Sequence, residues 1–302
     1  STAQLAERAL GERLELAVHT LPFGRAAGAL SGRRLARTVA IVGGTAPSGQ
    51  ADYAITGEAL EPVAGQGREQ AASGHPRRVV VPGLGLWMRP ALPSRERERK
   101  PGDRRVLAVS LAQAAALDAH SLAAWDNALG GRARLHLVPN LSAASVPSVA
   151  LELSRPLAHT DVTLSPVAGP QACADLLADA DLYLHVPGDL GALTALAAGC
   201  PVVARAGSDR IVPAVMQAVG LPDWLVARSA GEYSAAIRRL VADPGLRVEL
   251  RASIDRARVL AVMNDPMLPA HLAVALAWVR EAGPTTGGHP VFIGAGSAPT
   301  LL

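Results

Sequence analysis

Three short loops in the second half of the chain contain the glycines and charged residues that could hold an anionic ligand. They span residues 165–170, 186–191 and 205–210, and each follows a short apolar run and precedes a stretch with a helical pattern. Glycines such as Gly188 and Gly191 let the backbone approach a phosphate closely, and N–H groups at a helix start favour anions. Ordinary turns between strands and helices have the same composition, so both interpretations stay open.

The charged residues of these loops favour opposite conclusions. Arg205 and Arg210 are the nearest basic candidates for a phosphate, although each is more often a surface arginine. Asp189 lies between the two glycines and would oppose a phosphate, unless its carboxylate caps the helix that follows. The loop therefore has either a nucleotide-binding or a purely structural role.

The other candidates for chemistry are weaker. His185 ends an apolar run beside the same loops and is more typical of a core or rim histidine than of a base, whereas His19, with Thr20, could act as a general base at the end of an early strand. No spacing of His, Cys, Asp or Glu indicates a metal site, and no P-loop or nucleophile elbow occurs. Cys173 and Cys200 lie among apolar residues and predict inert thiols. No catalytic residue is assigned.

Short apolar runs alternate with Ala-rich helical patterns, which predicts parallel α/β layers that position these loops. The expected strands are Leu14–Val18, Thr38–Val42, Tyr53–Thr56, Val79–Val81, Val106–Ser110, Ala133–Val138, Asp161–Leu164, Leu182–His185 and Pro201–Ala204. The expected helices are Asp118–Leu129, Pro170–Ala178, Leu190–Ala198, Val212–Val219, Glu232–Ala242, Leu246–Val262 and Pro269–Ala282.

These elements suggest four segments. We expect residues 1–92 to form a partial N-terminal Rossmann-like lobe with about half of the usual strands. Either the chain is a fragment or this lobe is reduced. Residues 93–104, rich in charge, form a linker. Residues 105–282 form a C-terminal lobe that ends in helices, and residues 283–302 form a loosely held tail.

Composition narrows the classes of protein further. The chain has 302 residues, of which 49% are hydrophobic and 18% charged, so it can bury a core and is not a disordered chain. No uninterrupted apolar run is long enough for a membrane span, and no signal peptide is visible, so we expect a cytoplasmic protein. A net charge of +3 with 4 Trp, 3 Tyr and 2 Phe argues against nucleic-acid binding.

Several motifs follow one another in an order that resembles a known family. In the second half, Ser-Pro-Val-Ala at 165–168 precedes a helical stretch, then Ala-Asp-Leu-Tyr-Leu at 180–184 and Leu-Ala-Ala-Gly-Cys-Pro-Val-Val at 196–203. In the first half, Arg-Thr-Val-Ala-Ile-Val-Gly at 37–43 precedes Asp-Tyr-Ala-Ile-Thr at 52–56. From residue 6 to residue 280 this order resembles the catalytic region of the O-GlcNAc transferase family, whose GT-B fold has two Rossmann-like lobes.

The resemblance implies a substrate class. The family transfers GlcNAc from UDP-GlcNAc to Ser or Thr hydroxyls, so the implied donor is a UDP-sugar, without a metal cofactor, and the implied acceptor is a protein. The nucleotide-binding positions carried over from the family are Ala168, Gly188, Asp189, Leu190, Gly191, Thr194 and Arg210.

Most charged side chains of the family site are replaced in this sequence. In the helix after Ala168, the family's lysine falls at Pro170, its histidine at Cys173 and its arginine at Leu176. The family's lysine that faces the diphosphate falls at Ala115 or Ala116, and the aspartate that holds the ribose falls at Thr194. Departing UDP carries negative charge that needs cationic or N–H donors. Two functions follow: a divergent UDP-sugar-dependent glycosyltransferase, or an inactive pseudo-glycosyltransferase that serves as a scaffold or as the partner subunit of an active enzyme.

Overall fold

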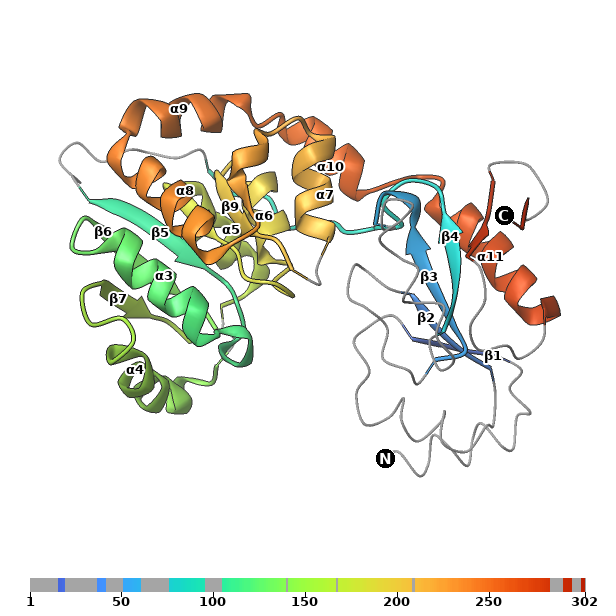
Figure 1. The fold of residues 1–302 in the computed structure, drawn as a ribbon, viewed down its shortest axis with the longest axis horizontal. Helices are drawn as coiled ribbons and strands as arrows, with labels where there is room; N and C mark the ends of the chain where they lie inside the picture. The colour runs from blue at the N-terminus through green and yellow to red at the C-terminus, as the bar shows by residue number, and fades with distance from the viewer. Residues whose placement is uncertain are drawn as a thin grey trace. The chain divides into compact units, whose positions relative to one another are not determined.

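Two six-stranded sheets organise the chain (Figure 1). The computed structural model describes residues 16–19, 37–41, 51–60, 76–95, 105–139, 141–166, 168–207, 210–282, 290–294 and 300–301. Contacts divide the chain into a first unit, residues 1–87 with 264–302, and a second unit, residues 88–263. Each unit contains one of the sheets, and no helix of the described part is long and apolar enough to cross a membrane.

The first sheet is mostly parallel. Its strands are β1 (Leu16–His19), β2 (Arg37–Ile41), β3 (Tyr53–Gly57), β4 (Arg77–Val81), β11 (Val291–Phe292) and β12 (Thr300–Leu301), adjacent in that order. Strands β1 to β4 and β11 run parallel, and β12 pairs antiparallel with β11. A short 3₁₀ turn, η1 (Glu58–Leu60), follows β3. The four early strands match the predicted ones to within two residues at each end.

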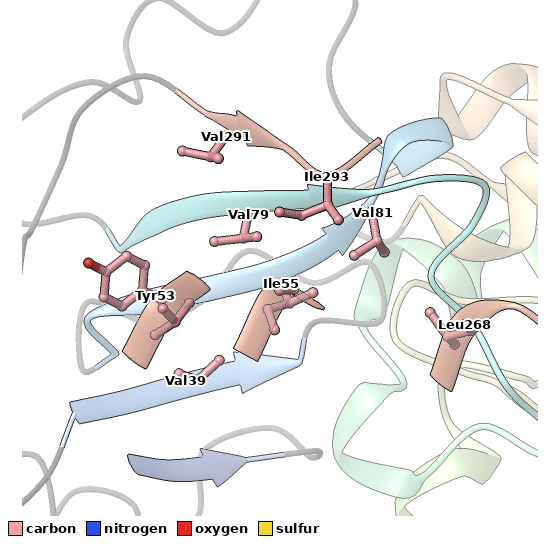
Figure 2. Close-up of a cluster of buried hydrophobic side chains, with 10 residues drawn as sticks. Val39, Tyr53, Ile55, Val79, Val81, Leu268, Val291 and Ile293 are labelled. Carbon is pink, nitrogen blue, oxygen red and sulfur yellow. The ribbon is translucent and has the colours of Figure 1, made fainter. Parts of the chain in front are cut away.

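Among the described residues, helix α11 (Leu268–Ala282) covers this sheet and contributes to its core. It packs against β3 and β4. Apolar side chains of β2, β3, β4 and β11 form a buried cluster with side chains of this helix (Figure 2). The cluster comprises Val39, Tyr53, Ile55, Val79, Val81, Leu268, Ala275, Val279, Val291 and Ile293. The ring of Tyr53 also contacts that of Trp278 edge-on at a centroid distance of 5.9 Å.

The contacts divide the chain differently from the expected boundaries. Helix α11, expected to end the lobe of residues 105–282, belongs to the first unit. Its apolar stripe is buried on the first sheet, and helical periodicity alone does not say which sheet a stripe will cover. Residues 291–293, expected in a loose tail, pair beside β4. Of the expected linker, residues 93–95 lie in the second unit, and 96–104 lie outside the described residues.

The second sheet is fully parallel, in the order β10-β9-β8-β5-β6-β7. Its strands are β5 (Val106–Ser110), β6 (Ala133–Leu137), β7 (Asp161–Leu164), β8 (Leu182–Leu184), β9 (Val202–Arg205) and β10 (Val226–Ala227). Its helices are α3 (Ala119–Leu129), α4 (Val146–Ser154), α5 (Pro170–Asp179), α6 (Gly191–Ala197), α7 (Ile211–Ala218), α8 (Ala230–Ala242), α9 (Pro244–Ser253) and α10 (Arg256–Met263). The described residues also form the 3₁₀ turns η3 (Ala114–Ala116), η4 (Ala143–Ser145) and η5 (Asp223–Leu225). The predicted α/β class is confirmed.

Two details of the second unit differ from expectation. Residues 246–262 were expected to form one helix, but α9 ends at Ser253, Ile254 is extended, and α10 begins at Arg256. The Asp255 carboxylate accepts a hydrogen bond from the Arg258 N–H at 3.1 Å, so it caps the new helix and explains the break. Helix α4 was not expected; a proline in its first turn, Pro147, favours its start.

Candidate functional site

The carboxyl edge of the second sheet holds the loops singled out by the sequence. Strand β5 has β6 as its neighbour on one side and β8 as its neighbour on the other. The strand order therefore reverses between β5 and β8. In open α/β sheets, ligands bind at the carboxyl ends of the strands where the strand order reverses in this way. The loops after β5 and β8 therefore form the candidate site, and the loop after β9 lies beside them.

A buried tyrosine ties these two loops together. The hydroxyl of Tyr183, on β8, donates to the Asp189 carboxylate and accepts from the Leu111 N–H at 3.0 Å. Asp189 Oδ1 also accepts from the Gly191 N–H at 2.8 Å. Burial and the Asp189 charge raise the pKa of Tyr183 well above its usual value, so its hydroxyl remains a donor. The two loops are thus held by one hydrogen-bonded cluster.

The close packing around Gly191 explains why this position is a glycine. A Cβ at Gly191 would lie 2.5 Å from the Tyr183 hydroxyl, 2.8 Å from Leu111 Cβ and 2.9 Å from Asp189 Oδ1. The glycine is therefore needed for contact between the loops. The first N–H of α6 already has an anion, because the Asp189 carboxylate, only 6% exposed, accepts from it. A phosphate at this helix start would have to displace Asp189 or bind beside its charge.

The basic candidate Arg205 is also engaged by a carboxylate. Its Nη1 donates to Asp118 Oδ2 at 2.7 Å and to Ser121 Oγ at 2.6 Å. Asp118 is the N-cap of α3 and accepts from the Ser121 N–H at 2.8 Å. Burial by itself would raise the pKa of Asp118, but the Ser121 N–H and the Arg205 charge outweigh it, and the pKa is lowered. Arg205 thus already neutralises an ionised group.

A second pair of buried aromatic residues fixes the backbone where the loop after β8 begins. The Tyr233 hydroxyl, on α8, donates to the His185 carbonyl at 2.7 Å, and Trp125 Nε1, on α3, donates to the Tyr233 hydroxyl at 3.1 Å. Burial raises the pKa of Tyr233, which keeps the hydroxyl neutral. Tyr233 falls within the predicted helix Glu232–Ala242, and the sequence analysis assigned no role to its hydroxyl. A useful signal would have been that a buried tyrosine hydroxyl normally needs a hydrogen-bond partner.

The structure separates the predicted nucleotide-binding residues into three groups. Gly188, with a positive φ of 88°, and Asp189, Leu190, Gly191 and Thr194 share the β8 loop and α6. Ala168 lies after β7, where its carbonyl accepts from Cys173 Sγ at 3.7 Å. Arg210 precedes α7, in a loop whose residues 208 and 209 lie outside the described residues. Leu190 is exposed, and Thr194 and Arg210 are half-buried.

The remaining sequence candidates are accounted for in part. His185 is fully buried at the end of β8, as expected for a core histidine. His19 ends β1, but its side chain and Thr20 lie outside the described residues. Burial raises the pKa of the Cys173 thiol, in agreement with an inert side chain. Among the described residues, no group of three or more His, Cys, Asp or Glu side chains could hold a metal ion.

A polar pair that the sequence did not suggest lies at the other side of the same edge. His136 Nε2, on β6, is 2.8 Å from Ser165 Oγ, just after β7. Both residues are half-buried. Their separation of 29 positions in the sequence hides the pairing, since only the parallel register of β6 and β7 brings them together.

No family model matches the chain, and a comparison with curated proteins finds no match. Solved structures do match. An O-GlcNAc transferase mutant from Thermobaculum terrenum aligns with a TM-score of 0.64 and 20% identity over 93% of this chain and 55% of that chain. Sucrose-phosphate synthase from Thermosynechococcus elongatus aligns with a TM-score of 0.60 and 15% identity over 93% and 77%.

A third match is the pneumococcal O-GlcNAc transferase GtfA in complex with UDP and GlcNAc, with a TM-score of 0.54 and 11% identity over 92% of this chain and 60% of that chain. At these identities the likeness shows the fold. It confirms the predicted resemblance at that level: the chain has the Rossmann-like α/β lobes of GT-B glycosyltransferases. The chain spans little more than half of the Thermobaculum protein, 55%.

Proposed function

We propose that the chain is a pseudo-glycosyltransferase, which keeps the fold, does not transfer sugar by itself, and serves as a scaffold or as the partner subunit of an active glycosyltransferase. The observation that carries the proposal is the Asp189 carboxylate, buried at the first N–H of α6 and held there by Tyr183. This position corresponds to the phosphate loop implied by the family resemblance.

The electrostatic cost of a phosphate beside Asp189 supports this proposal. Two like unit charges about 5 Å apart repel by about 3 kcal/mol at an effective dielectric constant of about 20. Since about 1.4 kcal/mol is a factor of ten in affinity, one such contact weakens binding by about two decades. Displacing Asp189 instead would leave a buried carboxylate and the Tyr183 hydroxyl without each other. Either route disfavours a UDP-sugar.

The ion pair between Arg205 and Asp118 also supports a chain that does not transfer sugar by itself. Catalysis of sugar transfer requires donors that stabilise departing UDP, and loss of one donor typically costs about 10²–10³ in rate. The N–H of Gly191 and the guanidinium of Arg205 are two groups that could serve, and each already binds a carboxylate of the chain. The engagement of both groups therefore supports the absence of sugar transfer by the chain alone.

A second candidate is a divergent UDP-sugar-dependent glycosyltransferase with a protein acceptor. One observation favours it: among the described residues, no side chain caps α5, which begins at Pro170 and whose N-cap, Gly169, follows Ala168. Backbone N–H groups at such a helix start could hold a nucleotide without the charged side chains that the family uses.

A donor-hydrolysis and transfer assay separates the two candidates. The purified chain is incubated with UDP-GlcNAc or UDP-glucose and a Ser/Thr-rich peptide, and released UDP is measured against a no-protein control. We expect no release above the control from the chain alone, and stimulation when the chain is added to a glycosyltransferase that co-purifies with it. Release of UDP by the chain alone, abolished by Gly169→Pro but not by Asp189→Ala, would instead establish the second candidate.

A further inference from the structure

The pair formed by His136 and Ser165 has the geometry of a base next to a hydroxyl nucleophile. Residues His136 and Thr163 are opposite each other in the parallel pairing of β6 and β7, so Ser165 follows on the same face of the sheet. The Nε2 to Oγ distance is 2.8 Å, which is within hydrogen-bond reach. The Ser165 N–H donates to the Leu137 carbonyl at 2.9 Å, which fixes the backbone that carries the hydroxyl.

The charge state of His136 suits a proton acceptor. Burial lowers the pKa of His136 below its usual 6.5, and the positive charge of Arg134, two residues earlier on the same strand, lowers it further. The imidazole is therefore neutral at pH 7, and its Nε2 can accept the proton of the Ser165 hydroxyl. The opposite strand contributes the carboxylate of Asp161, which is engaged by Arg105 at 3.2 Å.

The space beside Gly169, at the start of the helix that follows Ser165 in the chain, is open. Ser165 lies four positions before Gly169, and a Cβ built on Gly169 would meet no atom of the described residues within 4 Å. Gly169 is the N-cap of α5, and because Pro170 has no N–H, the N–H groups of the first turn without a partner within the helix are those of Gln171 and Ala172. Such N–H groups stabilise the oxyanion that forms when a hydroxyl attacks a carbonyl.

We propose that Ser165 is a reactive serine, activated by His136, that accepts an acyl group from small activated esters. The Ser165 Oγ forms a bond to the carbonyl carbon while its proton passes to His136 Nε2. The tetrahedral intermediate then expels the alcohol, whose oxygen takes the proton back from His136 as the C–O bond breaks. The products are the alcohol and an acylated Ser165. The proposal is independent of nucleotide binding at the β8 loop.

The test uses p-nitrophenyl acetate on the full chain. We expect an initial burst of p-nitrophenolate, a mass increase of one acetyl group, and a peptide map that places the acetyl group on Ser165. Peptide mapping of the wild-type protein needs no variant, so it remains decisive if a substitution impairs folding. Acetylation confined to other residues, or no acetylation, would overturn the proposal.

Variants locate the activating group. Ser165→Ala should abolish the burst, and His136→Gln should lower the acylation rate by about 10²-fold, since a positioned base contributes about 10²–10⁴-fold. The matched control is Ser142→Ala, because Ser142 Oγ lies 2.9 Å from another serine hydroxyl, that of Ser145, on an exposed segment. The control should leave the burst unchanged. A burst that His136→Gln leaves intact would contradict activation by the histidine.

Discussion

Helices α5 and α6 both begin at the carboxyl edge of the second sheet, but their N-termini have different surroundings. At α6 the buried Asp189 carboxylate accepts from the first N–H, and Tyr183 holds that carboxylate in place. At α5, among the described residues, no side chain caps the helix, and the space beside Gly169 is open. Both helices follow glycine-containing loops that look alike in sequence.

If the proposed function holds, the difference means that a phosphate-loop composition does not by itself make a phosphate site. Helix α3 also begins beside a carboxylate: its N-cap Asp118 accepts from the Ser121 N–H and pairs with Arg205, whereas Asp189 precedes Leu190, the N-cap of α6. Where the strand order reverses, the chain thus supplies its own anions. The edge near β7 lacks this arrangement in the described residues and carries the His136 and Ser165 pair instead.

The largest contrast should come from adding one methyl group at each helix start. Gly191→Ala places a Cβ in contact with Tyr183, Leu111 and Asp189, so we expect a loss of about 3 kcal/mol in the free energy of unfolding. Gly169→Ala adds its Cβ to open space at a negative φ of −64°, and the change should stay within about 0.5 kcal/mol. Urea unfolding measures both. Equal losses would contradict the difference between the two helices.

The hydroxyl that holds Asp189 should matter more than the one that holds a neutral carbonyl. Tyr183→Phe leaves a buried carboxylate and the Leu111 N–H without their partner, which costs about 2 kcal/mol or more. Tyr233→Phe affects the neutral His185 carbonyl and the Trp125 indole, so about 1 kcal/mol is expected. Chemical unfolding measures the loss in the free energy of unfolding for both variants. A larger loss for Tyr233→Phe than for Tyr183→Phe would contradict this expectation.

Removing the charge of Asp118 should have a smaller effect. The paired side chains of Arg205 and Asp118 are 26% and 42% exposed, so we expect Asp118→Asn to cost at most about 1 kcal/mol. Asparagine keeps an oxygen that caps α3, whereas Asp118→Ala also loses the cap and costs about 1 kcal/mol more. Thermal unfolding at low and high salt checks the assignment: the cost of Asp118→Asn should shrink as salt screens the pair.

The smallest expected effect is on the pH dependence of stability, through protonation of His136 near β7. The pKa of His136 is lower in the folded chain than its usual 6.5, so the unfolded chain binds a proton first as the pH falls. Stability therefore decreases from pH 6.5 downward until the folded pKa is reached. The charged groups on its two strands are Arg134, and Asp161 paired with Arg105.

His136→Gln should flatten the stability profile in this window. The carboxyls of Asp118 and Asp126 act elsewhere, because their pKa values lie below the usual 3.8 and their contribution is lost only at lower pH. Unfolding midpoints between about pH 5 and about pH 7 separate the groups. An unchanged slope in the variant would mean that the histidine is not the group responsible.

Local patterns predicted most elements of the fold. Strands β5 and β7 have the predicted bounds, because short runs with β-branched residues bounded by turn residues are specific signals. The sheet that α11 would cover was not predictable, since an amphipathic stripe identifies a buried face and not its partner. The division of residues 246–262 into two helices depends on the Asp255 cap, a signal that was present in the sequence and was not used.

The location of the candidate site was predictable from the sequence, but the hydrogen bonds of its residues were not. The loop containing Asp189 was identified, and both of its roles were open; the hydrogen bonds of Asp189 with Gly191 and Tyr183 favour the structural role. The bonds of Tyr183 to Leu111 and of His136 to Ser165 join residues 72 and 29 positions apart. Such contacts depend on strand order and register, which the sequence of one chain does not provide.

Calorimetric titration of UDP into the wild-type chain, Asp189→Ala and Asp189→Asn tests most directly whether Asp189 occupies the phosphate position. We expect the wild-type chain to bind with a Kd weaker than about 1 mM, the value that corresponds to about −4.1 kcal/mol. Asp189→Ala removes both the charge and the group on Gly191, and should bind at least tenfold more tightly. Asp189→Asn removes only the charge and should fall between the two. Wild-type binding as tight as that of Asp189→Ala would contradict the account.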